Sequence, residues 1–120
     1  MNVSIIHKTG VMGEVLDELS AGLPGIISEN LEVAGGKVAI LRPNQILLAF
    51  SAASPRDVGA DIRIVLFARS NAARKSHENT LAGSILERVI ALIAKSGKEY
   101  SVDIRLYLME IGAAEYLPVT

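Results

Sequence analysis

Three charged residues on predicted strands have the side chains best suited to chemistry in this chain. Asp103 and Arg105 are two positions apart in one strand, and Arg63 alternates with apolar residues in another. Successive side chains of a strand point to opposite faces of a sheet, so Asp103 and Arg105 share a face. A carboxylate there can act as a general acid or base, and a guanidinium can bind a substrate carboxylate. The alternative is an ion pair within the subunit that binds no ligand.

The two histidines have neither metal-ligand nor catalytic spacing. His7 follows Val3 and Ile5 on one face of the first predicted strand, so we interpret it as a hydrogen-bonded structural histidine. His77 lies among polar residues and is interpreted as solvated. The chain has no cysteine, which excludes a disulfide, a thiolate metal site and a cysteine nucleophile. We expect no metal and no cofactor.

A basic cluster precedes the second long helical pattern. Arg69, Arg74 and Lys75 lie close together there. The N-terminus of a helix attracts anions, so this cluster is one candidate for an anion site. The alternative, which we favour, is a surface cluster without a ligand.

Composition indicates one domain and excludes strongly charged partners. The chain has 120 residues, half of them hydrophobic, and a formal net charge of −1. This balance gives no electrostatic reason to expect nucleic acid or an anionic membrane as a partner. No secretory signal pattern opens the chain, and no apolar run approaches the roughly 20 residues that span a bilayer. We therefore expect a cytoplasmic protein.

Apolar periodicity predicts a first strand–helix–strand unit. A strand is expected over 2–8, followed by a helix with Thr9 as its N-cap. Pro24 should kink that helix or divide it into two pieces. A second strand is expected over 37–41, and a further short strand over 45–50.

The second half of the chain repeats this pattern. A strand is expected over 61–69, then a long helix capped by Ser70 or Asn71 and ended by Gly97. The last strand is expected over 102–109. The residues from Gly112 onward should form an edge strand or an arm.

Two such units predict an α/β fold, in the form of a two-layer α+β sandwich. Each helical crossover makes its two strands parallel, which gives tandem β-α-β repeats in halves of about 1–50 and 60–120. Side by side, the units form a four-stranded mixed sheet with two helices on one face, in a single domain over 1–120.

The other face of this sheet combines charges with large apolar groups. Phe67 and Tyr107 share it with Arg63, Asp103 and Arg105. A solvated face would carry fewer apolar groups, and a second core would not carry unpaired charges. We expect this face to be shared with neighbouring copies around a polar channel, in a homotrimer.

Several short motifs occur in a characteristic order along nearly the whole chain. They are Pro43-Asn44-Gln45 with Ala49-Phe50, Ser54-Pro55, Leu81-Ala82-Gly83 with Leu86-Glu87-Arg88, and Tyr107 with Met109. In this order they resemble the tautomerase superfamily, and most closely its macrophage migration inhibitory factor branch. The resemblance implies the β-α-β repeat fold described above.

The resemblance also implies a catalytic base that this chain lacks. The superfamily uses an N-terminal proline whose secondary amine is neutral near pH 7. Here Met1 is followed by Asn2, and we expect Met1 to be retained because Asn2 is not a small residue. The α-amino group of Met1 would be displaced by one residue from the position of that proline.

The remaining pocket groups of the family are also changed. The pocket lysine falls near Glu32, which reverses the charge. The pocket tyrosine and asparagine of the last strand fall on Asp103 and Arg105, and a backbone contact falls near Leu66. The resemblance therefore implies a pocket of Met1 and Asn2 with these four residues, at a boundary between subunits.

These observations predict a diverged tautomerase-fold homotrimer without ordinary proline-based keto–enol tautomerase activity. It would bind a small organic molecule or a partner at the subunit interface. One alternative is an isomerase or hydratase of a small carboxylate that uses Glu32, Asp103 and Arg105. Another is an interaction module that only resembles the family. Whether the chain is an enzyme stays open at this point.

Overall fold

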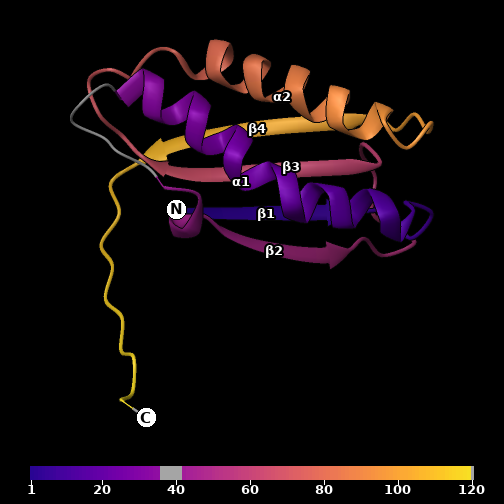
Figure 1. Cartoon of the computed structure of the whole chain (residues 1–120), viewed down its shortest axis with the longest axis horizontal. Coiled ribbons are helices and arrows are strands. Elements are labelled where there is room, and N and C mark those ends of the chain that lie inside the picture. Colours follow the sequence, from indigo (N-terminus) through magenta and orange to yellow (C-terminus); the bar gives the residue numbers. More distant parts are fainter. Residues whose placement is uncertain (36–41, 120) are drawn as a thin grey trace.

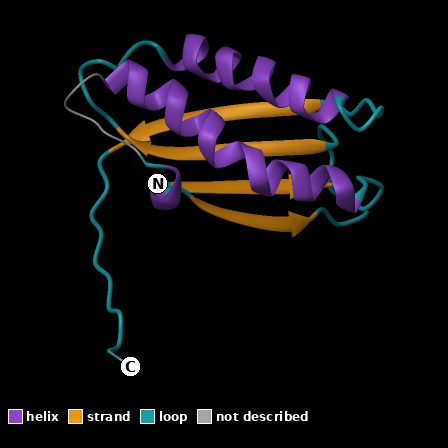
Figure 2. Ribbon diagram, viewed as in Figure 1, coloured by secondary structure: helices purple, strands orange, loops and turns teal. Residues whose placement is uncertain are grey.

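A four-stranded sheet lies under two helices that cover one of its faces (Figures 1 and 2). This computed structural model describes residues 1–35 and 42–119, with the side chains of 32–35 left aside. The elements are, in chain order, β1 (Asn2–His7), α1 (Gly13–Gly35), the 3-10 turn η2 (Pro43–Gln45), β2 (Leu47–Ala52), β3 (Ile62–Arg69), α2 (Glu78–Ala94) and β4 (Val102–Met109).

The strand order is that of two β-α-β units placed side by side. The sheet runs β2-β1-β3-β4. The pairs β1–β2 and β3–β4 are parallel, and the two units meet where β1 and β3 pair antiparallel. A parallel pair needs a crossover connection, which α1 and α2 provide. The predicted four-stranded mixed sheet with both helices on one face is confirmed.

Apolar side chains fill the space between the sheet and the helices. The face of β3 that the alternation predicts to be buried is at most 1% exposed throughout. Burial of one such side chain stabilises the fold by about 1.5–3 kcal/mol. The fully buried large side chains are Val3, Ile5, Val15, Leu19, Leu23, Ile27, Leu31, Ile62, Ile64, Leu66, Ile85 and Val89.

Helix α1 is one continuous helix, so of the two outcomes expected at Pro24, a kink or a division, the division into two pieces does not occur. An interior proline removes a backbone hydrogen bond and costs about 3 kcal/mol. Leu23 and Ile27, on either side of Pro24, are fully buried, and the burial of both halves offsets that cost. Thr9 is not the N-cap, because a turn separates it from the first helical residue, Gly13.

Helix α2 also begins later than the sequence predicts. Neither Ser70 nor Asn71 caps it, since it starts at Glu78. The side-chain oxygen of Asn71 instead accepts a hydrogen bond of 2.9 Å from the backbone N–H of Arg74, which closes a separate turn. The predicted stop is confirmed within a few residues: the helix ends at Ala94, and Gly97, three positions later, has a φ of 76°.

In the described part of the chain, the strand that completes the first unit is β2. The predicted strand over 37–41 lies outside the described residues. The short strand predicted over 45–50 is displaced by two residues, because Pro43–Gln45 forms a 3-10 turn first. Strand β2 then continues to Ala52, which pairs with His7.

The sheet face opposite the helices carries many exposed side chains, and we call it the open face. The strand registers assign its members to common rows across the sheet. They are Leu47, Ala49 and Ser51 from β2, Asn2, Ser4 and Ile6 from β1, Arg63, Val65, Phe67 and Arg69 from β3, and Asp103, Arg105, Tyr107 and Met109 from β4.

After β4 the chain leaves the sheet as an extended arm, residues 112–119. Figure 1 shows it running from the end of β4 past β1 and β2 to the C-terminus. It contains no strand, so of the two predicted possibilities the arm is correct. Within the described ranges, no helix is long and apolar enough to cross a membrane.

Candidate ligand site on the open face

The start of β1 places Met1 and Asn2 at one end of the sheet. The α-amino group of Met1 donates a hydrogen bond of 3.3 Å to the carbonyl oxygen of Gln45. The carbonyl of Met1 accepts a hydrogen bond of 2.9 Å from the backbone N–H of Leu47. Asn2 is exposed on the open face, and its row continues through Phe67. The amino end of β1 is therefore held against the beginning of β2.

Asp103 and Arg105 form an ion pair within the subunit. The Nε atom of Arg105 lies 3.2 Å from Oδ1 of Asp103, and the side chains are 66% and 37% exposed. Arg63, whose row includes Asp103, pairs with Asp57 at 3.9 Å instead. The intrasubunit ion pair that the sequence left as an alternative is present, and its exposure leaves both groups accessible to a ligand or a neighbouring copy.

The other two predicted pocket residues lie elsewhere. The side chain of Leu66 is fully buried under the helices, so in its own subunit only its backbone could take part in a site. Glu32 belongs to α1, and its side chain lies outside the described residues. The helices cover the face opposite Asp103 and Arg105 (Figure 2).

A single chain therefore does not bring the six predicted pocket residues together. Met1 and Asn2 lie at one end of the sheet, while Asp103 and Arg105 lie on an edge strand two strands away. A pocket built from all of them needs residues of a second copy, as the prediction of a boundary site states. That prediction stays a prediction.

An aromatic stack lies beside the Asp103–Arg105 pair. The rings of Phe67 and Tyr107 are stacked, with centroids 5.5 Å apart and planes at 17°. Tyr107 is 49% exposed. Offset stacked rings attract each other, so this pair forms an apolar platform next to charged groups. Leu47 and Met109 add exposed apolar surface to the same face.

Two polar clusters that the sequence does not predict lie at the end of the sheet away from Met1 and Asn2. The backbone N–H of Ser101 donates to the Asp61 carboxylate (3.0 Å), and the Asp61 N–H donates to the Ser101 hydroxyl (2.8 Å). The backbone of Ser101 foremost, with its side chain and Lys8, lowers the pKa of Asp61. These contacts join residues forty positions apart, so no local motif could reveal them.

The second cluster lines a hollow of about 330 Å³ beside Lys8 and Pro55. The backbone N–H of Ser54 donates to Asp57 at 3.0 Å. This bond foremost, with the Ser54 hydroxyl and Arg63, lowers the pKa of the Asp57 carboxyl. Asp57 is thus paired with Arg63 and hydrogen-bonded to Ser54. We interpret these contacts as holding the loop after β2 in place.

Arg74 is a buried residue, so the sequence-based view of it as part of a surface cluster is wrong. It is 5% exposed, and its guanidinium donates to the carbonyls of Arg69 (3.0 Å) and Leu31 (3.5 Å). Burial lowers its pKa. Its Nε has no partner among the described residues. Arg74 thus connects the end of β3 to the C-terminal half of α1.

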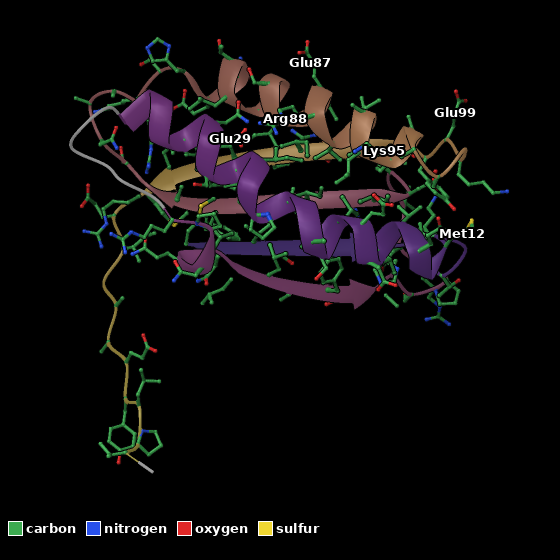
Figure 3. The ribbon with its side chains drawn as sticks, in the orientation of Figure 1. Met12, Glu29, Glu87, Arg88, Lys95 and Glu99 are labelled. Atoms are coloured by element: carbon green, nitrogen blue, oxygen red, sulfur yellow. The ribbon has the colours of Figure 1, made fainter. Side chains whose placement is uncertain are left out.

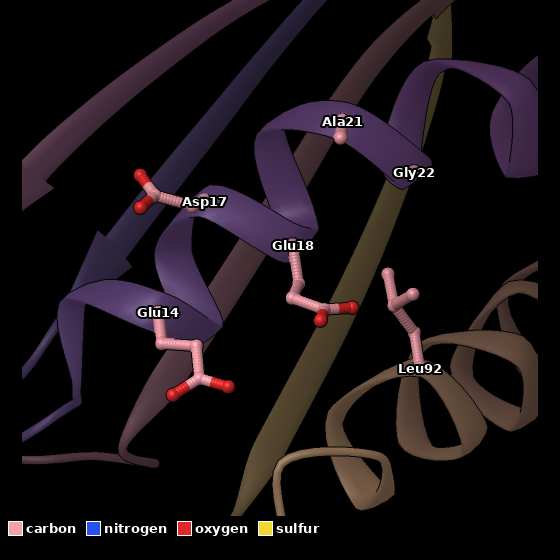
Figure 4. A pocket seen from close by; sticks show the side chains of 6 residues that line it. All are labelled: Glu14, Asp17, Glu18, Ala21, Gly22 and Leu92. Carbon is pink, nitrogen blue, oxygen red and sulfur yellow. The ribbon is translucent and has the colours of Figure 1, made fainter.

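The helical layer has an open hollow of about 500 Å³ between α1 and α2. Figure 4 shows Glu14 and Glu18 of α1 and Leu92 of α2 around it. Farther along these helices, Arg88 forms an ion pair with Glu29 (Figure 3). Carboxylates from one helix do not define a ligand, and the described residues contain no group of three His, Cys, Asp or Glu side chains suited to a metal.

Solved structures match this chain, although sequence comparisons do not. No protein-family model and no curated protein matches this chain. A solved malonate semialdehyde decarboxylase matches with a TM-score of 0.63 and 8% identity, over 96% of this chain and 93% of its own. A fused 4-OT described as a symmetric trimer matches with a TM-score of 0.58 and 16% identity, over 98% and 94%. A macrophage migration inhibitory factor-like protein from Entamoeba histolytica matches with a TM-score of 0.55 and 15% identity, over 90% and 87%.

These neighbours are members of the tautomerase superfamily. The chain therefore has the tautomerase fold, built from two β-α-β units with a four-stranded mixed sheet and two helices. At these identities the likeness establishes the architecture, and function must be argued from the residues.

Proposed function

We propose that this chain forms a homotrimer that binds a small organic molecule where the open faces of neighbouring copies meet. The observation that carries the proposal is the open face itself. It holds an exposed ion pair, Asp103–Arg105, directly beside the Phe67–Tyr107 stack. Exposed apolar surface on a soluble domain marks an interaction site, and convergent polar groups give such a site its ligand chemistry. One structural neighbour is described as a symmetric trimer, which supports this assembly.

We further propose that ordinary proline-based keto–enol tautomerase activity is absent. The four prolines of the chain are Pro24, Pro43, Pro55 and Pro118, and none lies at the beginning of β1. Enolisation needs a neutral base together with a cation or hydrogen-bond donor for the developing oxyanion. The family's pocket lysine falls near Glu32, an acidic residue, so the cation that the family has at that position is also missing.

A second candidate is an isomerase or hydratase of a small carboxylate. The exposed guanidinium of Arg105 suits a substrate carboxylate, and Asp103 and Glu32 are the candidate acid and base. The structural neighbour malonate semialdehyde decarboxylase is described as having decarboxylase and hydratase activities, which supports testing hydration.

A substrate panel separates these candidates. The purified chain is assayed with phenylpyruvate and a hydroxymuconate for tautomerisation, and with small unsaturated and 3-oxo carboxylates for hydration and isomerisation. We expect no tautomerisation, and we expect Asn2→Pro not to restore it, because the cationic partner is still missing. Tautomerase turnover like that of a proline-bearing relative would refute the first proposal. Turnover of a carboxylate that is lost in Arg105→Ala but kept in Arg88→Ala would establish the second.

A further inference from the structure

The arm formed by residues 112–119 is an apolar segment that lacks a site in its own subunit. Tyr116, Leu117 and Val119 are 84%, 75% and 100% exposed. Within the described part of the chain, no hydrogen bond or ion pair joins these eight residues to the domain. The last anchor is Arg69, whose guanidinium donates to the carbonyl of Ile111 at 3.2 Å. The arm therefore leaves the sheet from a fixed position.

The open face also exposes apolar side chains to water, but on a folded surface that can receive a segment such as the arm. Leu47, Tyr107 and Met109 are 63%, 49% and 37% exposed. The stacked rings of Phe67 and Tyr107 lie on this surface. An apolar arm and an apolar face that both occur in one chain can cover each other when two copies meet.

The charges of the two surfaces are also complementary. The arm carries Glu115, is preceded by Glu110, and contains no lysine or arginine. The strand residues of the open face include three arginines, Arg63, Arg69 and Arg105, and one acidic residue, Asp103. Arg105 is 66% exposed and lies next to Tyr107 on this face. An acidic residue beside Tyr116 would thus approach a basic residue beside Tyr107.

The direction of the arm favours a second copy over its own sheet, and its length is sufficient. Eight extended residues span up to about 28 Å. A sheet of four strands about 4.8 Å apart is about 15 Å across. Figure 1 shows the arm passing the β2 edge and ending outside its own sheet.

We infer that the arm of one copy packs across the open face of a second copy, with Tyr116 and Leu117 against the Phe67–Tyr107 stack and Glu115 paired with Arg105. This inference rests on the proposed self-association and names the segment that completes the boundary site. Each copy gives an arm and receives one, which allows a closed ring.

The test compares assembly of the full chain with that of a chain ending at Ile111, by sedimentation velocity over a micromolar dilution series. The shortened chain should keep its circular dichroism spectrum but need at least about a tenfold higher concentration to assemble. Val58→Ala, which shortens another apolar side chain that is 91% exposed, serves as the control and should assemble normally.

A charge exchange tests the proposed pair without removing the arm. Glu115→Arg and Arg105→Glu should each weaken assembly by about tenfold or more, and the double variant should recover most of that loss. A shortened chain that assembles like the full chain, or a double variant as weak as the two losses combined, would overturn the arm inference and leave the trimer standing. A full chain that stays monomeric would overturn both.

Discussion

Replacing Arg105 by alanine removes one member of the Asp103–Arg105 pair and leaves the other in place. The expected cost depends on where the pair lies in the assembled protein. In the isolated subunit the two side chains are 66% and 37% exposed. An exposed ion pair of this kind contributes between about 0 and 1 kcal/mol, so Arg105→Ala should barely change the stability of a monomer.

The cost is larger if neighbouring copies cover the open face. Breaking a buried pair by removing one partner costs about 3–5 kcal/mol, because the remaining carboxylate is left desolvated. The difference from the exposed case is about 2–5 kcal/mol per interface. At about 1.4 kcal/mol per tenfold, this raises the dissociation constant of the assembly by between about thirty-fold and four-thousand-fold.

The assay combines circular dichroism with sedimentation over a dilution series. Arg105→Ala should keep its secondary structure and dissociate at concentrations where the wild type stays assembled. Arg88→Ala is the matched control, because Arg88 pairs with Glu29 on the helical layer, with side chains 47% and 65% exposed. An Arg105→Ala protein with unchanged assembly, melting and ligand response would show that Arg105 is a solvated surface charge. The boundary site would then lose its main support.

Three further predictions concern stability. Asp61→Asn should destabilise the protein at neutral pH, and the difference from wild type should shrink as pH falls below about 4 in acid titrations. The lowered pKa of Asp61 contributes its full stability above the ordinary value of 3.8, and this contribution is lost as pH falls through the folded-state pKa. Gly25→Ala should stabilise α1 by about 0.5–1 kcal/mol in urea denaturation. Gly22→Ala should gain less, since its Cβ would lie 2.9 Å from the Leu92 Cδ2 atom; equal gains would contradict the close helix contact. Arg74→Ala should cost about 2–4 kcal/mol, whereas Arg74→Met should stay within about 1.5 kcal/mol of wild type, because it removes a desolvated charge but keeps most of the packing; equal losses would show that the charge itself is required.

The sequence predicts the layers of this fold because they depend on local alternation. The buried face of β3, from Ile62 to Ala68, follows from a period of two residues. The start of α2 is missed for an equally local reason. Ser76 has a φ of 69°, a left-handed conformation that ends the turn before the helix, and serine gives no sequence signal for it.

The candidate site is only partly predictable because it depends on contacts between distant segments. The strand alternation puts Asp103 and Arg105 on one face, and the structure confirms that they pair. The sequence contains no sign of the buried position of Arg74, which results from the packing of the β3 end against α1. In the proposed boundary site, the relation of Glu32 and Met1 to that pair would depend on the placement of a second copy, which no single-chain pattern encodes.

The most direct test of the account is the molar mass of the protein in solution, measured by light scattering on a sizing column at micromolar concentration. The open face and the arm predict an assembly of about three times the 12.8 kDa chain mass. A single species at the chain mass would contradict the shared open face and, with it, a ligand site at the subunit boundary.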